Sequence, residues 1–339
     1  MKTLAHGGAL DAAIAEFGGK RPEWLDLSTG ISPRSWPIPE IERRFFTRLP
    51  EQGDLDRAEM AARKAYGVAD AMAVVAVTGS QTAIEFLPRI LPGKSATILT
   101  SGHGTYGEHA HCCAKAGRTV REIVDPGEIR PDETLAVLVH PNNPDGQLSK
   151  REKIFRLARL LGGNGGHVIV DEAFGDSLPT HSFLAGQPDN VIVLRSLGKF
   201  FGLAGIRAGF VICAPTIAAR IRTFLGPWPI SGPAIAIAAQ ALADRDWIAS
   251  SQKWQVGQSA ELEKLLAGQG LRITGRHPLF VLASHECATA IARGLAHRHI
   301  AVRRFADRPQ LLRFGLPANA EEMMRLRRAL AQSTEPVVS

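Results

Sequence analysis

Short β-branched segments alternate with helical patterns from about residue 55 to residue 212, and this alternation constrains the fold more than any other feature of the chain. Strands that alternate with helices are typical of a mainly parallel sheet covered by helices on both faces. The sequence therefore predicts an α/β fold with such a sheet at its centre. The expected strands are Ala73–Val77, Ala96–Thr100, Thr119–Val124, Leu135–Val139, His167–Val170, Val191–Leu194 and Gly209–Ile212.

After Pro215 the pattern changes to long helices followed by further strands. A chain of 339 residues also exceeds the roughly 250–300 residues at which a single core stops growing. We expect an amino-terminal arm over residues 1–35 that associates with a small domain, a large α/β domain over residues 36–215, and a small α+β domain over residues 216–339. Its expected elements are helices Ile217–Leu225, Pro233–Leu242, Trp247–Ala267 and Ala320–Ala331, and strands Leu271–Thr274, Leu279–Ala283 and Leu311–Phe314.

Composition favours a cytoplasmic protein that binds small molecules. Apolar residues make up 45% of the chain, but no apolar run reaches the roughly 18 residues of a membrane span, and the amino terminus lacks the apolar stretch of a secretory signal. The four cysteines show no C-x-x-C spacing, so neither a disulfide framework nor a metal site is expected. The net charge of +7 comes from scattered arginines, which fits small anionic ligands better than nucleic acid.

One glycine-rich segment, Gly102-His103-Gly104-Thr105-Tyr106-Gly107, matches the dinucleotide-binding pattern G-x-G-x-x-G. It follows an expected strand and opens a helix, and Asp125 stands at the end of the next strand, where an acid would bind a ribose hydroxyl. A nicotinamide-dependent dehydrogenase is therefore one hypothesis. The competing interpretation is an ordinary glycine-rich turn, because the pattern explains no other part of the chain.

A second set of segments starts with Val77-Thr78-Gly79-Ser80-Gln81-Thr82, which links an expected strand to an expected helix. Glycine allows the backbone N–H groups at the start of the helix to converge on an anion, and Ser80 adds a hydroxyl donor. The turn-forming segment His140–Gly146 follows the strand Leu135–Val139 and exposes an amide at the carboxyl end of the sheet. These segments predict a phosphate site beside a polar side chain.

Charged residues complete this set. Asp171 ends a hydrophobic strand, where burial raises the pKa of a carboxyl group unless a cation or hydrogen-bond donors keep it ionised. Lys199 is flanked by phenylalanines in a glycine-rich segment, which favours an amine with a pKa lowered by desolvation, and Arg207 follows eight residues later. Arg313 lies in an apolar strand and needs an anion from the protein or a ligand, with Arg303 as a possible second cation.

These five segments, in this order, resemble the fold-type I pyridoxal 5'-phosphate enzymes of the aspartate aminotransferase superfamily over roughly residues 25 to 330. The resemblance implies that Lys199 carries the cofactor as a Schiff base and that Asp171 binds the pyridinium nitrogen. It also implies that Asn143 binds the phenolic oxygen and that Tyr106 stacks on the ring. The phosphate would be held by Gly79, Ser80, Gln81, Ser196 and Arg207.

Within this superfamily the chain is most similar to the threonine-phosphate decarboxylases of cobalamin biosynthesis, which form aminopropanol phosphate. The motifs are His6-Gly7-Gly8, Asp26-Leu27-Ser28, Asn142–Gly146 and Asp171–Phe174. The resemblance implies a homodimer and a phosphorylated amino acid as substrate. Its phosphate and carboxylate would be bound by His6, Gly7, Gly8, Arg303 and Arg313.

Two alternatives stay open. Histidinol-phosphate aminotransferases share most of these motifs, and the sequence does not fix which bond of the substrate is held perpendicular to the cofactor ring. A catalytically silent regulatory or binding protein of the same fold is the alternative from another class. The intact lysine, aspartate, asparagine and arginine argue against it.

Overall fold

The computed structural model describes residues 7–130 and 132–334, and the chain divides into two compact units. The larger unit contains residues 35–143 and 147–248. The smaller unit contains the described residues up to Arg34, residues 144–146, and the described residues from Ala249 onward. The domain boundaries expected from the sequence remain a prediction.

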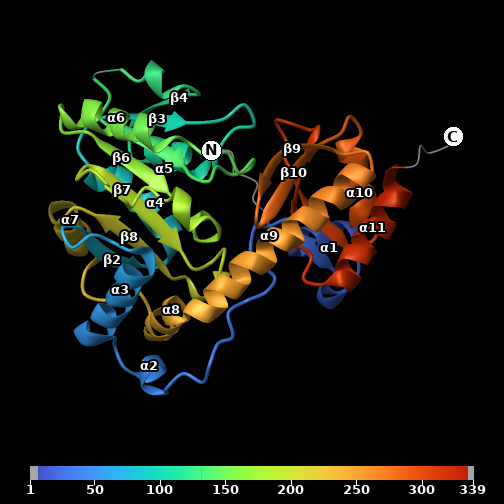
Figure 1. The fold of residues 1–339 in the computed structure, drawn as a ribbon, viewed down its shortest axis with the longest axis horizontal. Helices are drawn as coiled ribbons and strands as arrows, with labels where there is room; N and C mark the ends of the chain where they lie inside the picture. The colour runs from blue at the N-terminus through green and yellow to red at the C-terminus, as the bar shows by residue number, and fades with distance from the viewer. Residues whose placement is uncertain (1–6, 131, 335–339) are drawn as a thin grey trace. The chain divides into compact units, whose positions relative to one another are not determined.

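The larger unit is built on a seven-stranded sheet with the order β2-β8-β7-β6-β5-β3-β4 (Figure 1). β8 runs antiparallel to both of its neighbours, and the other pairs are parallel. The expected α/β fold with a mainly parallel sheet is therefore confirmed. The strands are β2 (Ala73–Val77), β3 (Ser95–Leu99), β4 (Thr119–Ile123), β5 (Leu135–Val139), β6 (His167–Asp171), β7 (Val191–Ser196) and β8 (Gly209–Cys213).

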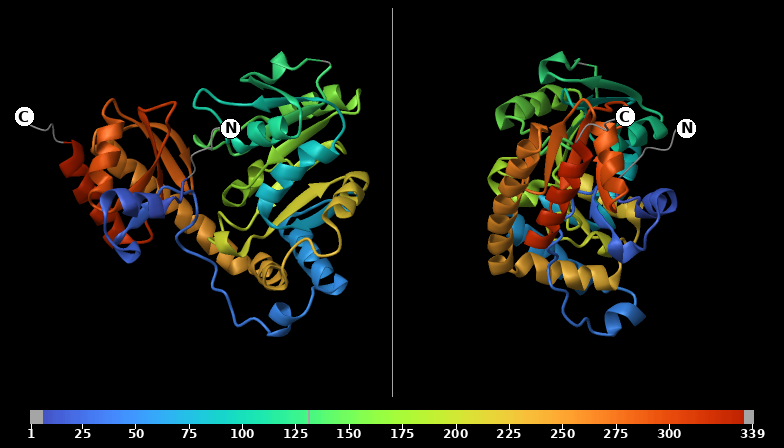
Figure 2. Two further views of the ribbon diagram at one scale, coloured as in Figure 1. Left: turned by 180° about the vertical axis from the view of Figure 1, so that it is seen from behind. Right: turned by 90° about the vertical axis from the view of Figure 1, so that its right-hand side faces the viewer.

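Helices cover both faces of this sheet, as Figures 1 and 2 show. Successive side chains of a strand point to opposite faces, so Val168 and Val170 enter one core while Ile169 enters the other. Burial on both faces explains why the strands are continuous apolar runs. One face is covered by α4 (Gly79–Ile90), α5 (Glu108–Lys115) and α7 (Pro215–Leu225), and the other by α3 (Gln52–Tyr66), α6 (Arg151–Gly162) and α8 (Gly232–Ala243).

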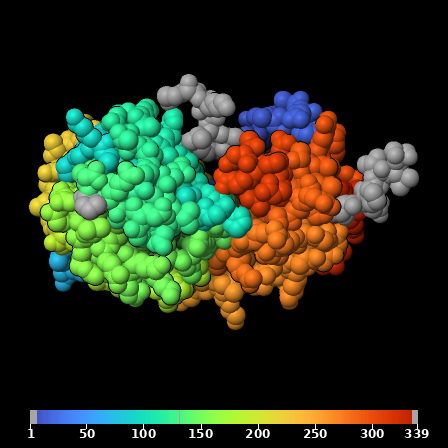
Figure 3. Space-filling view, turned by 90° about the horizontal axis from the view of Figure 1, so that it is seen from above, coloured from blue at the N-terminus to red at the C-terminus, as the bar shows by residue number. Residues whose placement is uncertain are grey.

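The smaller unit has a five-stranded sheet with the order β1-β11-β12-β10-β9. In Figure 3, α1 lies in blue on the surface beside orange and red residues of the same unit. The strands are β1 (Leu25–Leu27), β9 (Arg272–His277), β10 (Phe280–Ser284), β11 (Ile300–Arg304) and β12 (Leu311–Gly315). The α-helices are α1 (Leu10–Phe17), α9 (Arg245–Gly268), which begins in the larger unit, α10 (Ala288–Ala296) and α11 (Ala320–Thr334).

The sequence analysis did not predict β1 and β11, which pair in parallel. β1 has three residues, which is too few to show an alternating pattern, and β11 ends in two arginines.

Among the described residues, no helix combines the length and the apolar character needed to cross a bilayer. The remaining elements are short: α2 (Arg44–Thr47), η1 (Arg21–Glu23), η2 (Pro126–Glu128), η3 (Gly175–Ser177), η4 (Pro179–His181) and η5 (Ala204–Ile206).

A buried ionic network fixes the chain just after β6 in the larger unit. Arg195 on β7 lies 2.8 Å from Glu172 and 3.4 Å from Asp176, measured between nitrogen and oxygen atoms. Glu172 also accepts hydrogen bonds from the Ser182 hydroxyl and the Phe183 amide. Burial raises the pKa of Asp176 to about 6, although Arg195 acts in the opposite direction. The network therefore holds the segment that follows Asp171, the residue at the end of β6.

The substitution Asp176→Asn tests this electrostatic description. Asp176 binds its proton more tightly in the folded chain, so its contribution to stability is greatest below the unfolded pKa of 3.8 and is lost as the pH rises through about 6. Relative to Asp176→Asn, the free energy of unfolding of the unmodified protein should fall by up to about 3 kcal/mol across this window. Urea denaturation of both proteins at several pH values measures it, and a pH-independent difference would contradict the account.

Candidate active site

The carboxyl ends of three neighbouring parallel strands of the larger unit carry the predicted cofactor residues. Asp171 ends β6, Ser196 ends β7, and Asn143 follows β5 at a half-buried position. Adjacent parallel strands end at the same edge of a sheet, which is where open α/β sheets bind their ligands. The strand order therefore brings these three residues to one edge.

An anion seat forms where α4 begins. Gly79 has a φ of 73°, and a Cβ atom at this position would lie 3.1 Å from Nη2 of Arg207. Gly209 at the start of β8 allows a similar approach, because a Cβ atom there would lie 2.8 Å from the Ser80 amide nitrogen. The pairing of Gly209 with both Val77 and Ser196 places the start of α4 beside the end of β7. Helix N–H groups, a hydroxyl and a guanidinium thus converge, which fits a phosphate monoester.

Gly79→Ala tests the seat. The added Cβ forces the Arg207 guanidinium to move and also places an L side chain in the left-handed region. We expect pyridoxal 5'-phosphate to dissociate about tenfold more readily, measured by fluorescence titration of the apoprotein. Gly67→Ala is the matched control, because Gly67 has a φ of 62° but no heavy atom within 4 Å of the added Cβ. Equal losses in both variants would contradict a role for Arg207.

Gln81 was predicted to hold the phosphate, but its side chain is directed elsewhere. The amide accepts a hydrogen bond of 3.1 Å from the Tyr106 hydroxyl and donates one of 3.2 Å to Glu108. Gln81 lies in the first turn of α4, where backbone N–H groups have no partner within the helix. Its backbone amide is therefore the group suited to an anion.

Asp171 is buried and meets two donors. Its Oδ2 lies 2.8 Å from Nε2 of His109, and its Oδ1 accepts a 3.0 Å hydrogen bond from the Ala173 amide. His109 is 2% exposed and comes from the first turn of α5, three residues after Tyr106. The sequence analysis expected a cation or donors for Asp171 but did not find His109. Its position on the buried face of α5, together with Cys112 and Cys113, is the signal that could have found it.

His109→Phe should destabilise the buried carboxylate. The substitution removes the hydrogen bond between His109 and the buried Asp171 carboxylate, which costs about 2 kcal/mol of unfolding free energy and weakens the interaction of Asp171 with a protonated ring nitrogen. We expect about tenfold weaker cofactor binding in a titration of the apoprotein. His111→Phe on the same helix, at a half-buried position, is the control and should leave cofactor affinity unchanged.

Lys199 lies in the turn that follows β7. Its Nζ is 5.5 Å from the centre of the Phe174 ring, and the side chain is half-buried. The neighbouring Phe200 and Phe201 are fully buried in the core and pack against Trp247. The flanking phenylalanines therefore anchor the turn that presents the lysine. The lowered pKa expected for this amine remains a prediction.

The glycine-rich segment that contains Tyr106 is a turn held by hydrogen bonds to Asn142. Asn142 accepts a 2.7 Å hydrogen bond from the Thr105 hydroxyl and donates to the Gly104 carbonyl at 3.0 Å. The Tyr106 ring meets His109 edge-on, with ring centres 6.1 Å apart. The segment thus links the loop after β5 to the start of α5 and presents an aromatic ring.

The substrate residues predicted from the sequence lie in the smaller unit, except His6, which lies outside the described residues. Gly8 donates a 2.8 Å hydrogen bond to the Ser28 hydroxyl, and Arg313 donates one of 3.2 Å to the Ser28 carbonyl. A Cβ atom at Gly7 would lie 2.2 Å from that carbonyl oxygen. Arg303 and Arg313 are paired across β11 and β12. The structure therefore brings the described members of this set together.

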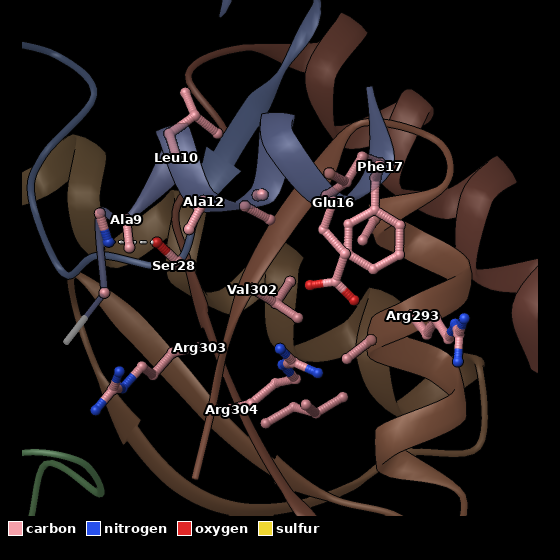
Figure 4. Close-up of a pocket in the computed structure, with 18 of the residues that line it drawn as sticks. Ala9, Leu10, Ala12, Glu16, Phe17, Ser28, Arg293, Val302, Arg303 and Arg304 are labelled. Atoms are coloured by element: carbon pink, nitrogen blue, oxygen red, sulfur yellow. Dashed lines mark hydrogen bonds between the residues drawn. The ribbon is translucent and has the colours of Figure 1, made fainter. Parts of the chain in front are cut away.

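Arg303 and Arg313 bring two positive charges close together. Burial and the nearby Arg303 lower the pKa of Arg313 to about 9, and both causes would be offset by a bound anion. A cavity of about 560 Å³ lies between α1, α10 and β11 and includes Gly7, Gly8 and Arg303 in its lining. Figure 4 shows Arg303 on one side of this cavity and Arg304 on another.

Comparisons with known proteins identify the family of the chain. The family model described as aminotransferase class I and II matches residues 52–330. A relative from Sinorhizobium sp. called threonine-phosphate decarboxylase is 37% identical, with 97% of this chain and 98% of the relative covered. Another of the same name from Pseudomonas aeruginosa is 39% identical, covering 98% of this chain and 99% of the relative. These matches extend over nearly the whole length of each protein.

Aminotransferases match at lower identity. A histidinol-phosphate aminotransferase of Mycobacterium bovis is 28% identical over 88% of this chain and 79% of its own. The crystal structure of histidinol-phosphate aminotransferase from Sinorhizobium meliloti, in complex with pyridoxal 5'-phosphate, superposes with a TM-score of 0.79. It is 20% identical and the match covers 98% of this chain and 95% of that chain. The last comparison shows that the fold is shared.

Proposed function

The chain belongs to the aminotransferase class I and II family, and from this premise we propose that it decarboxylates L-threonine O-3-phosphate to (R)-1-aminopropan-2-yl phosphate and CO2 in cobalamin biosynthesis. The cofactor of this family is pyridoxal 5'-phosphate. One observation carries the choice of reaction. The relatives at 37% and 39% identity over almost the full chain are threonine-phosphate decarboxylases, whereas the reported aminotransferase relative is 28% identical.

In this proposal the larger unit holds the cofactor. Bound pyridoxal 5'-phosphate supplies a protonated ring that draws off the electron pair of a bond broken at the substrate's α-carbon. Asp171 would bind the protonated ring nitrogen, and hydrogen bonds to His109 and the Ala173 amide hold its carboxylate in position. Lys199 would hold the cofactor covalently through its amine, and the same amine would carry a proton for the substrate's α-carbon.

The phosphate seat supports the same assignment. Gly79, Ser80 and the Gln81 amide offer the free N–H groups of a helix start, and Arg207 adds a full positive charge. Ser196 lies beside them at the end of β7, where its hydroxyl oxygen accepts a 3.2 Å hydrogen bond from the Gly198 amide. We assign Tyr106 to the face of the ring and Asn143 to its phenolic oxygen.

The residues of the smaller unit suit a substrate with two anionic groups. We assign Arg313 and Arg303 to its carboxylate and phosphate, together with His6 and the backbone of Gly7 and Gly8. Decarboxylation requires that the bond to the carboxylate lies perpendicular to the ring plane, so anchoring both anionic ends is a physical means of selecting C–C over C–H cleavage. The buried guanidinium of Arg313, with its lowered pKa, is a fitting anchor.

We also propose that the protein is a cytoplasmic homodimer. Several large apolar side chains of the larger unit are exposed, and a partner subunit would remove them from water. They include Phe46, Leu49, Phe224 and Trp228, each at least 50% exposed.

Carbon dioxide release tests the proposed reaction. The purified protein with bound cofactor should release one CO2 for each L-threonine O-3-phosphate consumed, without any 2-oxo acid. Lys199→Ala should abolish release, because it removes both the covalent attachment and the proton carrier. Turnover of histidinol phosphate that depends on a 2-oxo acid acceptor would instead identify an aminotransferase. A protein that binds the cofactor but turns over neither substrate would favour a regulatory role.

A further inference from the structure

A chain of hydrogen bonds links the first turn of α5 to the predicted ring-stacking residue. Glu108, the first residue of α5, accepts a 3.2 Å hydrogen bond from the Gln81 amide nitrogen. The Gln81 carbonyl oxygen in turn accepts a 3.1 Å hydrogen bond from the Tyr106 hydroxyl. All three side chains are half-buried and belong to the larger unit.

The chemistry of these groups fixes the direction of each hydrogen bond in the series. An ionised carboxylate only accepts hydrogen bonds, so the Gln81 NH2 group must face Glu108. The Gln81 carbonyl then faces Tyr106, and the Tyr106 hydroxyl must donate. Without the carboxylate, either orientation of the amide would satisfy Tyr106, because a hydroxyl can donate or accept. The Glu108 carboxylate is therefore the group that selects one orientation of the Gln81 amide.

We propose that Glu108 is a positioning residue that fixes the amide orientation of Gln81 and thereby holds the Tyr106 hydroxyl as a donor and its ring in place to face the cofactor. This inference rests on the assignment of Tyr106 to the cofactor ring in the proposed function. It gives Glu108, to which the sequence analysis assigned no role, a function in the site. It also accounts for the Gln81 side chain, which does not point at the phosphate seat.

The surroundings of Tyr106 agree with a hydroxyl that keeps its proton. Burial, followed by the nearby charges of Asp171 and Glu108, raises the pKa of Tyr106 well above its usual value of 10. A competing role for Glu108 is purely structural. An acid in the first turn of a helix stabilises it through the helix dipole, typically by about 0.3–1 kcal/mol. A test must therefore separate amide orientation from helix stability.

The Tyr106 hydroxyl can be observed selectively, because the protein contains only two tyrosines. Protein labelled with 13C at the tyrosine ring carbon that bears the hydroxyl gives two signals, and that carbon senses whether the hydroxyl donates or accepts. Tyr66 is an internal reference, because it lies under the guanidinium of Arg195, 4.5 Å from the ring centre. Spectra are recorded for the unmodified protein, Glu108→Ala, Glu108→Gln and Glu85→Ala, all without cofactor.

Glu85→Ala is the matched control. Glu85 lies on α4 and contacts Lys115, Arg89 and Cys112, so its loss disturbs the same pair of helices without removing a bond to Gln81. Glu108→Gln is the isosteric variant. Its amide keeps the size of the side chain but offers both a donor and an acceptor, so it no longer selects one orientation of Gln81, and it also removes the charge near the helix start.

In Glu108→Ala we expect the Tyr106 signal to move, the Tyr66 signal to stay, and cofactor dissociation from the site to increase about threefold to tenfold in a titration of the apoprotein. Glu108→Gln should move the Tyr106 signal as well, because its amide can either accept from or donate to Gln81, and Glu85→Ala should change neither readout. If Glu108→Ala does not fold, Gln81→Leu replaces it. This substitution removes the carbonyl oxygen that accepts the hydrogen bond from the Tyr106 hydroxyl.

Two results would overturn the inference. One is an unchanged Tyr106 signal in Glu108→Ala, or in Gln81→Leu if that variant replaces it. The other is an unchanged Tyr106 signal in Glu108→Gln together with a loss of cofactor affinity, which would indicate a charge effect on the helix. The spectra do not depend on turnover, so the two proposals can fail separately. If the unmodified protein releases no CO2 but the Tyr106 signal moves in the variant, the proposed reaction is wrong and the positioning role of Glu108 still holds.

Discussion

A carboxylate buried at the end of a parallel strand must be given hydrogen-bond donors, and the larger unit is organised around meeting this need at Asp171. β6 delivers Asp171 to the edge of the sheet because its preceding residues are buried on both faces and cannot shift. α5 supplies His109 from the neighbouring connection, and the turn after β6 supplies the Ala173 amide. A carboxylate held in this way can bind a cationic ring nitrogen without first breaking a salt bridge to lysine or arginine.

The same first turn of α5 serves a second group. Glu108 contacts Gln81, which contacts Tyr106, and His109 contacts Asp171. In the proposed arrangement, two consecutive residues thus position the groups that bind the face and the nitrogen of the cofactor ring. The turn itself is held by Asn142, which pins the glycine-rich segment. Behind the site, the Arg195 network fixes the segment after β6. Polar pairs thus hold the glycine-rich segment and the segment after β6, whereas buried phenylalanines anchor the turn that carries Lys199.

Much of this could be predicted from the sequence because the signals are local. The strands of the larger unit are apolar runs bounded by turns; Asp171 is the last residue of a strand, and Gly79 and Lys199 follow shortly after one. Residues whose role depends on distant partners were missed. His109 looks like any histidine on an amphipathic helix until β6 is placed beside α5. β1 is too short to show a pattern, and Gly209 is informative only once the Ser80 amide is known to lie against it.

The central claim is that Lys199 is the residue to which the cofactor is attached, at the edge that also carries Asp171. Borohydride reduction of the coloured protein makes such a link permanent, and peptide mass spectrometry then locates the pyridoxyl group. The account predicts that the group lies on the peptide containing Lys199 and on no other lysine. Modification of a different lysine, or a reduced protein with no pyridoxyl group at all, would contradict it.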